Sequence, residues 1–174
     1  MAFEKLSTST TGGKAQIRFY EQIDNLFAEV KLLTSYRSRT IKDESGKSDF
    51  DEYAMTDSEE DFFLNALKYV VPETFGELAK IATGVQNSVF FETDSSTTDV
   101  VGFSLIDYEA YDNNILSVID KRLRKCYIYY VIKEWWAHTA FDDIYQRYEL
   151  LYREALREMK KKAWTLIKPL MTNE

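Results

Sequence analysis

The sequence predicts a mainly α-helical fold, a bundle of about four long helices with a β-hairpin inserted between the second and the third. Only six glycines and two prolines occur among the 174 residues, and an all-β protein would need more of both for its tight turns. Long stretches place apolar residues three and four positions apart, which is the spacing of one helix face. Hydrophobic residues make up 45% of the chain, so we expect a packed core.

The N-terminal segment is small and polar before the first helical pattern starts. Residues 7–13 read STSTTGG, a composition typical of a flexible segment. We therefore expect a flexible arm over residues 1–14 and a single helical domain over residues 15–174. The first helix is expected over residues 15–36, because apolar side chains recur there at helical steps. These side chains are Ile17, Phe19, Tyr20, Ile23, Leu26, Phe27, Val30 and Leu33.

A polar, acidic loop is expected over residues 39–54, followed by the second helix. Residues 56–59 (TDSE) have the form of a capping box, in which the first and last side chains bond each other's backbone N–H groups. Pro72 should break or kink this helix, because proline lacks a backbone donor and crowds the preceding turn. A continuation is expected to end near Gly84, a residue suited to a C-terminal cap.

The β-hairpin is predicted from two short runs rich in β-branched and aromatic residues, Ser88–Glu92 (SVFFE) and Val100–Ile106 (VVGFSLI). The turn between them is long, so its register stays open. Two strands alone are marginally stable. The hairpin is therefore expected either to cap the bundle or to pair with strands of another chain.

Two further helices complete the prediction. One begins at Asp112 or Asn113 and runs to about His138, and its centre, residues 126–132, is apolar or aromatic on every side. Such a helix lies at the middle of a bundle or is covered by a second subunit. The last helix is expected over residues 142–168, with a heptad-like seam that indicates antiparallel packing. The seam consists of Phe141, Tyr145, Tyr148, Tyr152, Ala155 and Met159.

Composition excludes several classes of function. The formal net charge is −7 and the isoelectric point is about 4.9, which argues against direct nucleic-acid binding. No apolar run approaches the length that a membrane span requires. The single cysteine, Cys126, cannot form an internal disulfide, so we expect a reducing compartment.

The residues that metal and nucleophilic chemistry require are scarce. A zinc site needs three or four close ligands, and the chain has one cysteine and one histidine. Cys126 and His138 would lie about 18 Å apart on one helix, too far to act as a pair. We therefore expect no metal, no cofactor and no enzymatic activity. Catalysis by carboxylates and tyrosines in a bundle cavity remains an alternative, because acidic residues are plentiful.

Aromatic side chains supply the first candidates for a partner interface. Trp135 and Trp136 point about 100° apart on a helix and cannot both face the core. We assign Trp135 to the core, together with Tyr127 and Val131, and Trp136 to an interface. The hairpin contributes three more candidates, Phe90, Phe91 and Phe103.

Basic side chains near the end of the last helix supply the other candidates, Lys160, Lys161 and Lys162. They could simply complement the helix dipole. They could also dock onto the acidic residues 43–61 of a neighbouring copy, and such a contact between different surfaces suits head-to-tail association.

Two blocks of sequence carry a resemblance. The first is residues 57–64 (DSEEDFFL), an acidic cap that leads into paired apolar residues. The second is the aromatic helix 119–136, followed by Tyr145, Tyr148 and Tyr152. In these blocks the chain resembles the head–tail connector (head-completion) proteins of tailed phages and prophages. It differs from them in its N-terminal arm and helix and in its longer last helix, which leaves its place in a virion open.

The resemblance implies a helical body with a hairpin or loop insertion, assembled as a ring under the portal, without catalytic residues. We therefore expect a non-enzymatic virion structural or assembly protein, a connector or adaptor. It would form a homo-oligomer and contact other virion proteins of the portal or tail. It would lie in the host cytoplasm during assembly and then in the virion. The alternative is an intracellular helical adaptor or regulatory protein that binds a protein partner.

Overall fold

The computed structural model describes residues 2–6, 16–42, 45–46, 53–79, 88–92, 99–106, 113–139 and 141–167. Within these ranges the fold is mainly helical, as predicted, and it also contains one antiparallel sheet. The helices are α1 (Ile23–Ser38), the short 3₁₀ helix η1 (Asp57–Glu59), α3 (Glu60–Ala79), α4 (Asn113–His138) and α5 (Asp142–Ile167). The strands are β1 (Ala2–Leu6), β2 (Gln16–Gln22), β3 (Ser88–Glu92) and β4 (Val100–Ile106).

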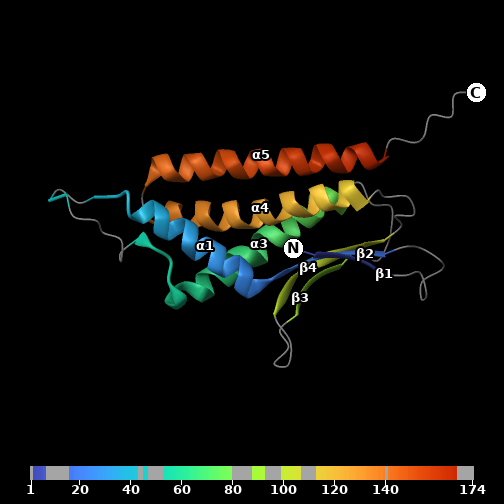
Figure 1. Ribbon diagram of the computed structural model, residues 1–174, viewed down its shortest axis with the longest axis horizontal. Coiled ribbons are helices and arrows are strands. Elements are labelled where there is room, and N and C mark those ends of the chain that lie inside the picture. The colour runs from blue at the N-terminus through green and yellow to red at the C-terminus, as the bar shows by residue number, and fades with distance from the viewer. Residues whose placement is uncertain are drawn as a thin grey trace, which may run out of the picture.

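The helices form layers around α4. Figure 1 shows α5 and α4 side by side along the long axis, with α1 and α3 on the other side of α4 and the sheet toward one end. The chain turns back between α4 and α5, so these two helices are antiparallel. The predicted order of two helices, a hairpin and two further helices is confirmed.

The hairpin prediction is confirmed with the bounds of both strands, and the hairpin is part of a larger sheet. The strand order is β1-β2-β4-β3, and all three pairings are antiparallel. In the hairpin, Val89 lies opposite Phe103. On the other side of β4, Ile17 of β2 lies opposite Leu105. Strand β4 is therefore internal, because β2 of the same chain pairs with the edge of β4 that the hairpin leaves open.

The first predicted helix is partly wrong, because residues 16–22 form strand β2 and the helix begins at Ile23. The side chains of Ile17, Phe19 and Glu21 are all buried, at 2%, 3% and 2% exposure. Burial of every second side chain is the pattern of a strand. Ile17 and Phe19 fit both a helix face and a strand, and burial on one side of the sheet favours the strand.

The N-terminal arm predicted over residues 1–14 contains a strand. Ala2–Leu6 pairs with β2 along its whole length. This part of the predicted arm is ordered by backbone hydrogen bonds, which the sequence did not indicate. Residues 7–13, on which the prediction of a flexible arm rested, lie outside the described residues.

Pro72 does not end the second helix, because α3 continues through it to Ala79. The carbonyl that loses its helical donor belongs to Lys68, and both residues lie on the exposed side of α3, where water can replace the bond. On the buried side the Thr74 hydroxyl donates to the carbonyls of Val70 (3.0 Å) and Val71 (2.9 Å). The predicted cap at Gly84 lies outside the described residues.

The core is centred on α4, whose middle was predicted to be apolar on every side. Its fully buried side chains lie on several faces of the helix. They include Leu116, Leu123, Cys126, Tyr127, Ile128, Val131, Ile132 and Trp136. The predicted seam of α5 faces α4: Tyr152, Ala155 and Met159 are buried, while Phe141, Tyr145 and Tyr148 are partly buried against the core.

Gly102 in β4 provides a test of the β2–β4 pairing. A Cβ atom at this position would lie 2.0 Å from the Phe19 carbonyl oxygen and 2.9 Å from Tyr20 Cα, both backbone atoms of the neighbouring strand. We expect Gly102→Ala to lower the free energy of unfolding by about 3 kcal/mol, as overpacking does, measured by urea denaturation.

Gly76 is the matched control, because a Cβ there would meet nothing within 4 Å and the residue lies inside α3. Gly76→Ala should raise the free energy of unfolding by about 0.5–1 kcal/mol. Equal effects of the two substitutions would contradict the close strand pairing at Gly102.

Candidate functional site

Of the two tryptophans of α4, Trp136 lies in the core and Trp135 packs partly buried against it. Trp136, a predicted interface residue, is 0% exposed and is the largest fully buried side chain of the described part. Its ring contacts Phe141 edge-on at a centroid distance of 5.7 Å. Trp135 is only partly buried, and its Nε1 donates to the Tyr53 carbonyl at 2.9 Å. The prediction for Trp136 is therefore wrong, because the side of α4 that packs inward carries Trp136.

The three phenylalanines of the hairpin lie in different environments. Phe103 is 0% exposed and packs between Phe19 and Phe75, at centroid distances of 5.6 Å to each. It is a core residue, so its prediction as an interface residue is wrong. Phe91 packs partly buried against the core. Phe90 lies on the opposite face of β3, where the Arg18 guanidinium stands 4.2 Å from its ring centroid.

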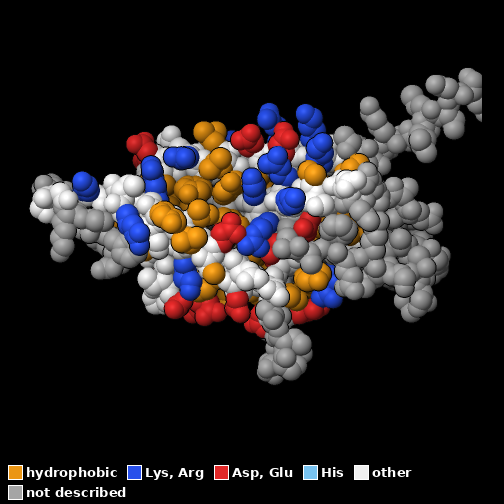
Figure 2. All heavy atoms as spheres, viewed as in Figure 1, with side chains coloured by type: hydrophobic (Ala, Val, Ile, Leu, Met, Phe, Trp, Pro, Cys, Tyr) orange, Lys and Arg blue, Asp and Glu red, His pale blue; other side chains and the backbone are white. Residues whose placement is uncertain are grey.

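The three lysines near the end of α5 lie in two environments, one in a contact within the chain and two at the surface. Lys160 forms an ion pair with Glu77 of α3 at 2.6 Å, so it joins two helices of the same chain. Lys161 and Lys162 are exposed. Figure 2 shows Lys and Arg side chains over the region of α5, with hydrophobic and acidic ones between them.

The exposed side of α5 carries a stripe at alternating steps of four and three residues, formed by Leu150, Glu154, Arg157, Lys161 and Trp164. We call these five residues the outer stripe. Leu150 is 68% exposed and Trp164 is 57% exposed. Neither Leu150 nor Trp164 was among the predicted interface residues. The seam could have revealed them, because residues opposite the seam must face away from α4.

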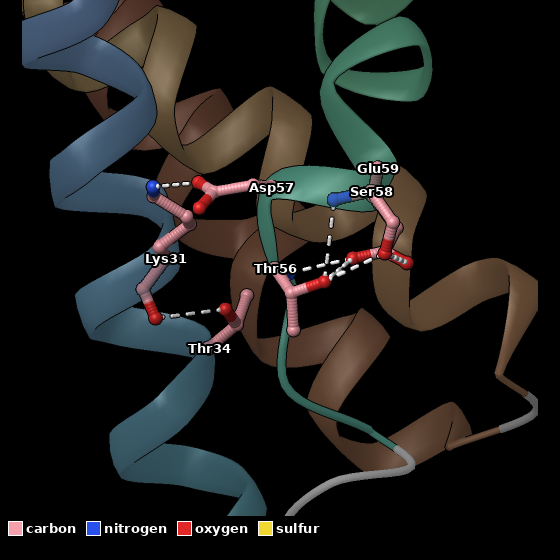
Figure 3. Close-up of polar contacts among 6 residues, drawn as sticks. All are labelled: Lys31, Thr34, Thr56, Asp57, Ser58 and Glu59. Atoms are coloured by element: carbon pink, nitrogen blue, oxygen red, sulfur yellow. Dashed lines mark hydrogen bonds and ion pairs between the residues drawn. The ribbon is translucent and has the colours of Figure 1, made fainter.

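The start of α3 carries the acidic surface. The predicted capping box is present: Glu59 Oε2 accepts the Thr56 N–H at 2.6 Å, and Thr56 Oγ1 accepts the Ser58 N–H at 3.4 Å. Figure 3 shows this box beside α1, where Lys31 pairs with Asp57. Hydrogen bonds from Ser58 and Thr56 lower the pKa of Glu59. The exposed carboxylates Asp57, Glu60 and Asp61 are thus held at one fixed position.

A groove of about 690 Å³ lies between the start of α3 and the end of α4. Tyr69 on its α3 side is 72% exposed. Phe62 contacts the His138 ring edge-on at 5.5 Å, and His138 is exposed at the end of α4. The residues that line the groove include Phe62, Lys68, Tyr69, Tyr130, Glu134 and His138. No pattern in the sequence predicts this groove, because two separate helices build it.

A cluster of charged residues joins the sheet to the helices. Arg124 of α4 donates to Glu21 of β2 at 2.6 Å and to Glu29 of α1 at 2.5 and 3.0 Å. Asp120, one turn before Arg124, is 5% exposed. Its burial, together with the Glu21 carboxylate, raises the pKa of Asp120 to about 7. Burial also raises the pKa of Glu21. The cluster can therefore hold a proton near neutral pH.

Cys126 is a buried core thiol. Burial raises the pKa of Cys126 to about 12, so the thiolate that nucleophilic chemistry requires is scarce at neutral pH. In the described ranges, no group of three or more His, Cys, Asp or Glu side chains is arranged to hold a metal ion.

Comparison of the chain with protein-family models, with curated proteins and with solved structures found no match. Among the described helices, none combines the length and the apolar character needed to cross a membrane.

The raised pKa of Asp120 predicts a pH-dependent stability. Between about pH 4 and about pH 7 the folded chain keeps a proton on Asp120 that the unfolded chain has released. The free energy of unfolding therefore falls as the pH rises through this window. Asp120→Asn removes the buried charge, so it should raise the Tm at pH 8 by several degrees and leave it nearly unchanged at about pH 4.

Glu29→Gln serves as the control, because it removes the partly exposed partner of Arg124. It should lower the Tm slightly at pH 8. Thermal unfolding followed by circular dichroism measures both variants, and a pH-independent effect of Asp120→Asn would contradict the assignment.

Proposed function

We propose that this chain is a non-enzymatic structural or assembly protein of a phage or prophage, a head–tail connector or adaptor that forms an oligomeric ring. It would contact other virion structural proteins at the portal or tail. The proposal combines the resemblance in residues 57–64 and 119–136 with one structural observation: surfaces of opposite charge lie on separate parts of the molecule.

The acidic surface is at the start of α3 and the basic one is on α5. Asp57, Glu60 and Asp61 are exposed at the first. Arg153, Arg157 and Lys161 are exposed at the second, where Arg153 also pairs with Glu149 of its own helix at 2.5 Å. In Figure 2 acidic side chains gather along the lower edge, while acidic and basic side chains are mixed over α5 at the top. Two different complementary surfaces favour head-to-tail association, which closes into a ring when the rotation between copies permits.

An intracellular adaptor is the second candidate, and the groove between α3 and α4 favours it. Its aromatic residues Phe62, Tyr69 and Tyr130, with a few polar groups, could receive side chains of a protein partner. The genes beside this one separate the two candidates: portal, capsid or tail genes are expected for the connector, and their absence favours the adaptor.

The mass of the purified protein tests the proposal, measured by light scattering coupled to size exclusion across salt and protein concentration. We expect an oligomer that dissociates as salt rises, because screening weakens contacts between exposed charges. The variant with Arg157→Glu and Lys161→Glu should be monomeric at low salt.

The variant with Lys121→Glu and Lys125→Glu is the matched control, because both lysines are exposed on α4 and the net charge changes equally. It should keep the mass of the wild type. A wild-type protein that is monomeric under all conditions would contradict the ring.

A further inference from the structure

We propose that the outer stripe of α5, led by Trp164, docks into the groove between α3 and α4 of a second copy of this chain. This inference rests on the proposed self-association and names the contact that would produce it. The two surfaces belong to different elements and carry three of the five large apolar side chains that are exposed among the described residues, namely Tyr69, Leu150 and Trp164.

The two surfaces cannot meet within one chain. The groove lies at the end of α4, where His138 is followed closely by the start of α5 at Asp142. Further along the groove, Tyr130 packs against Tyr152 of α5 at a centroid distance of 5.4 Å. Trp164 lies 12 residues beyond Tyr152, which is about 18 Å at 1.5 Å per residue. Figure 1 shows α5 running straight away from this end of the molecule. A second copy, displaced along the long axis, is needed to bring Trp164 to the groove.

The groove suits an aromatic anchor. Phe62, Tyr69 and Tyr130 supply aromatic surface from both of its helices. Its volume of about 690 Å³ falls within the roughly 300–1,000 Å³ of sites that enclose small molecules, so an indole ring has room. Tryptophan and tyrosine are the residues most enriched among those that dominate binding energy at protein interfaces. Lys68 can stand over the face of a bound indole as a cation.

The charges nearest Trp164 on the outer stripe complement a carboxylate of the groove, while Glu154 lies further back along the stripe. Arg157 and Lys161 precede Trp164 on the outer stripe, and Glu134 lies in the groove with 33% of its side chain exposed. Glu134 is held by Lys133 at 3.0 Å, but Lys133 also pairs with Glu149 at 3.3 Å. Glu134 can therefore turn toward a cation of the neighbouring copy without leaving Lys133 unpaired. Asp61, one residue before Phe62, adds negative charge beside the groove.

The contact joins two different surfaces, so each copy presents one of each. Such an interface is heterologous and generates a ring or a filament. It also makes a specific prediction for mixtures of two defective variants, because one copy can lack the anchor while the other lacks the groove.

Trp164→Ala removes the anchor and Tyr69→Lys blocks the groove, and both residues are largely exposed, so folding should be retained. Each variant alone should associate at least about 30-fold more weakly than the wild type, as loss of a dominant interface residue does. Mixed in equal amounts, the two should form a heterodimer and nothing larger, because one intact contact remains per pair. Light scattering at low salt measures the masses.

Leu32→Ala is the control, because Leu32 is 54% exposed on α1 and belongs to neither surface; it should retain the wild-type mass. Circular dichroism spectra that match the wild type establish that each variant is folded. A wild-type oligomer that both variants leave intact, or a mixture that stays monomeric, would overturn this contact and leave the proposed function standing. A monomeric wild type would overturn both.

Discussion

Helix α4 must be covered on nearly every side, and the other elements are arranged to do this. Leu123, Val131 and Trp136 are all fully buried, and α5, α3, α1 and β1 each contact part of α4. Cations that project from so apolar a helix need partners within the fold. Arg124 is paired with carboxylates of β2 and α1, and Lys133 is paired with carboxylates of α4 and α5. The need to cover α4 therefore determines both the layers of the fold and the ion pairs between them.

Much of the fold could be predicted because local patterns decided it. Three local patterns predict the element that the structure contains: the seam of α5, the apolar centre of α4 and the two hairpin strands. Strand β2 could not be predicted, because Ile17 and Phe19 also fit a helix face. What selects the strand is the free edge of β4, which lies far along the chain. Of the break or kink expected at Pro72, the break does not occur, since the packing of the buried side of α3 holds the helix together.

Less of the candidate site could be predicted. The capping box at the start of α3 is local and was found from four residues. The choice between Trp135 and Trp136 depended on the rotation of α4 against its neighbours, which no local pattern specifies. Phe103 lies in an internal strand only because β2 pairs beside it. The groove depends on how α3 crosses α4, so its residues share no spacing in the sequence.

The strand order β1-β2-β4-β3 has a consequence for synthesis on the ribosome. Strands β1 and β2 are made first and can form their own hairpin, but the partner on the other side of β2 is made only after α1 and α3. Until β4 emerges, an edge with apolar Ile17 and Phe19 has no native partner, and such an edge is prone to wrong pairing. Chaperone binding during translation would be most useful in this interval. Once β3 and β4 are complete, closure of the sheet is a long-range step that is expected to limit the rate of folding.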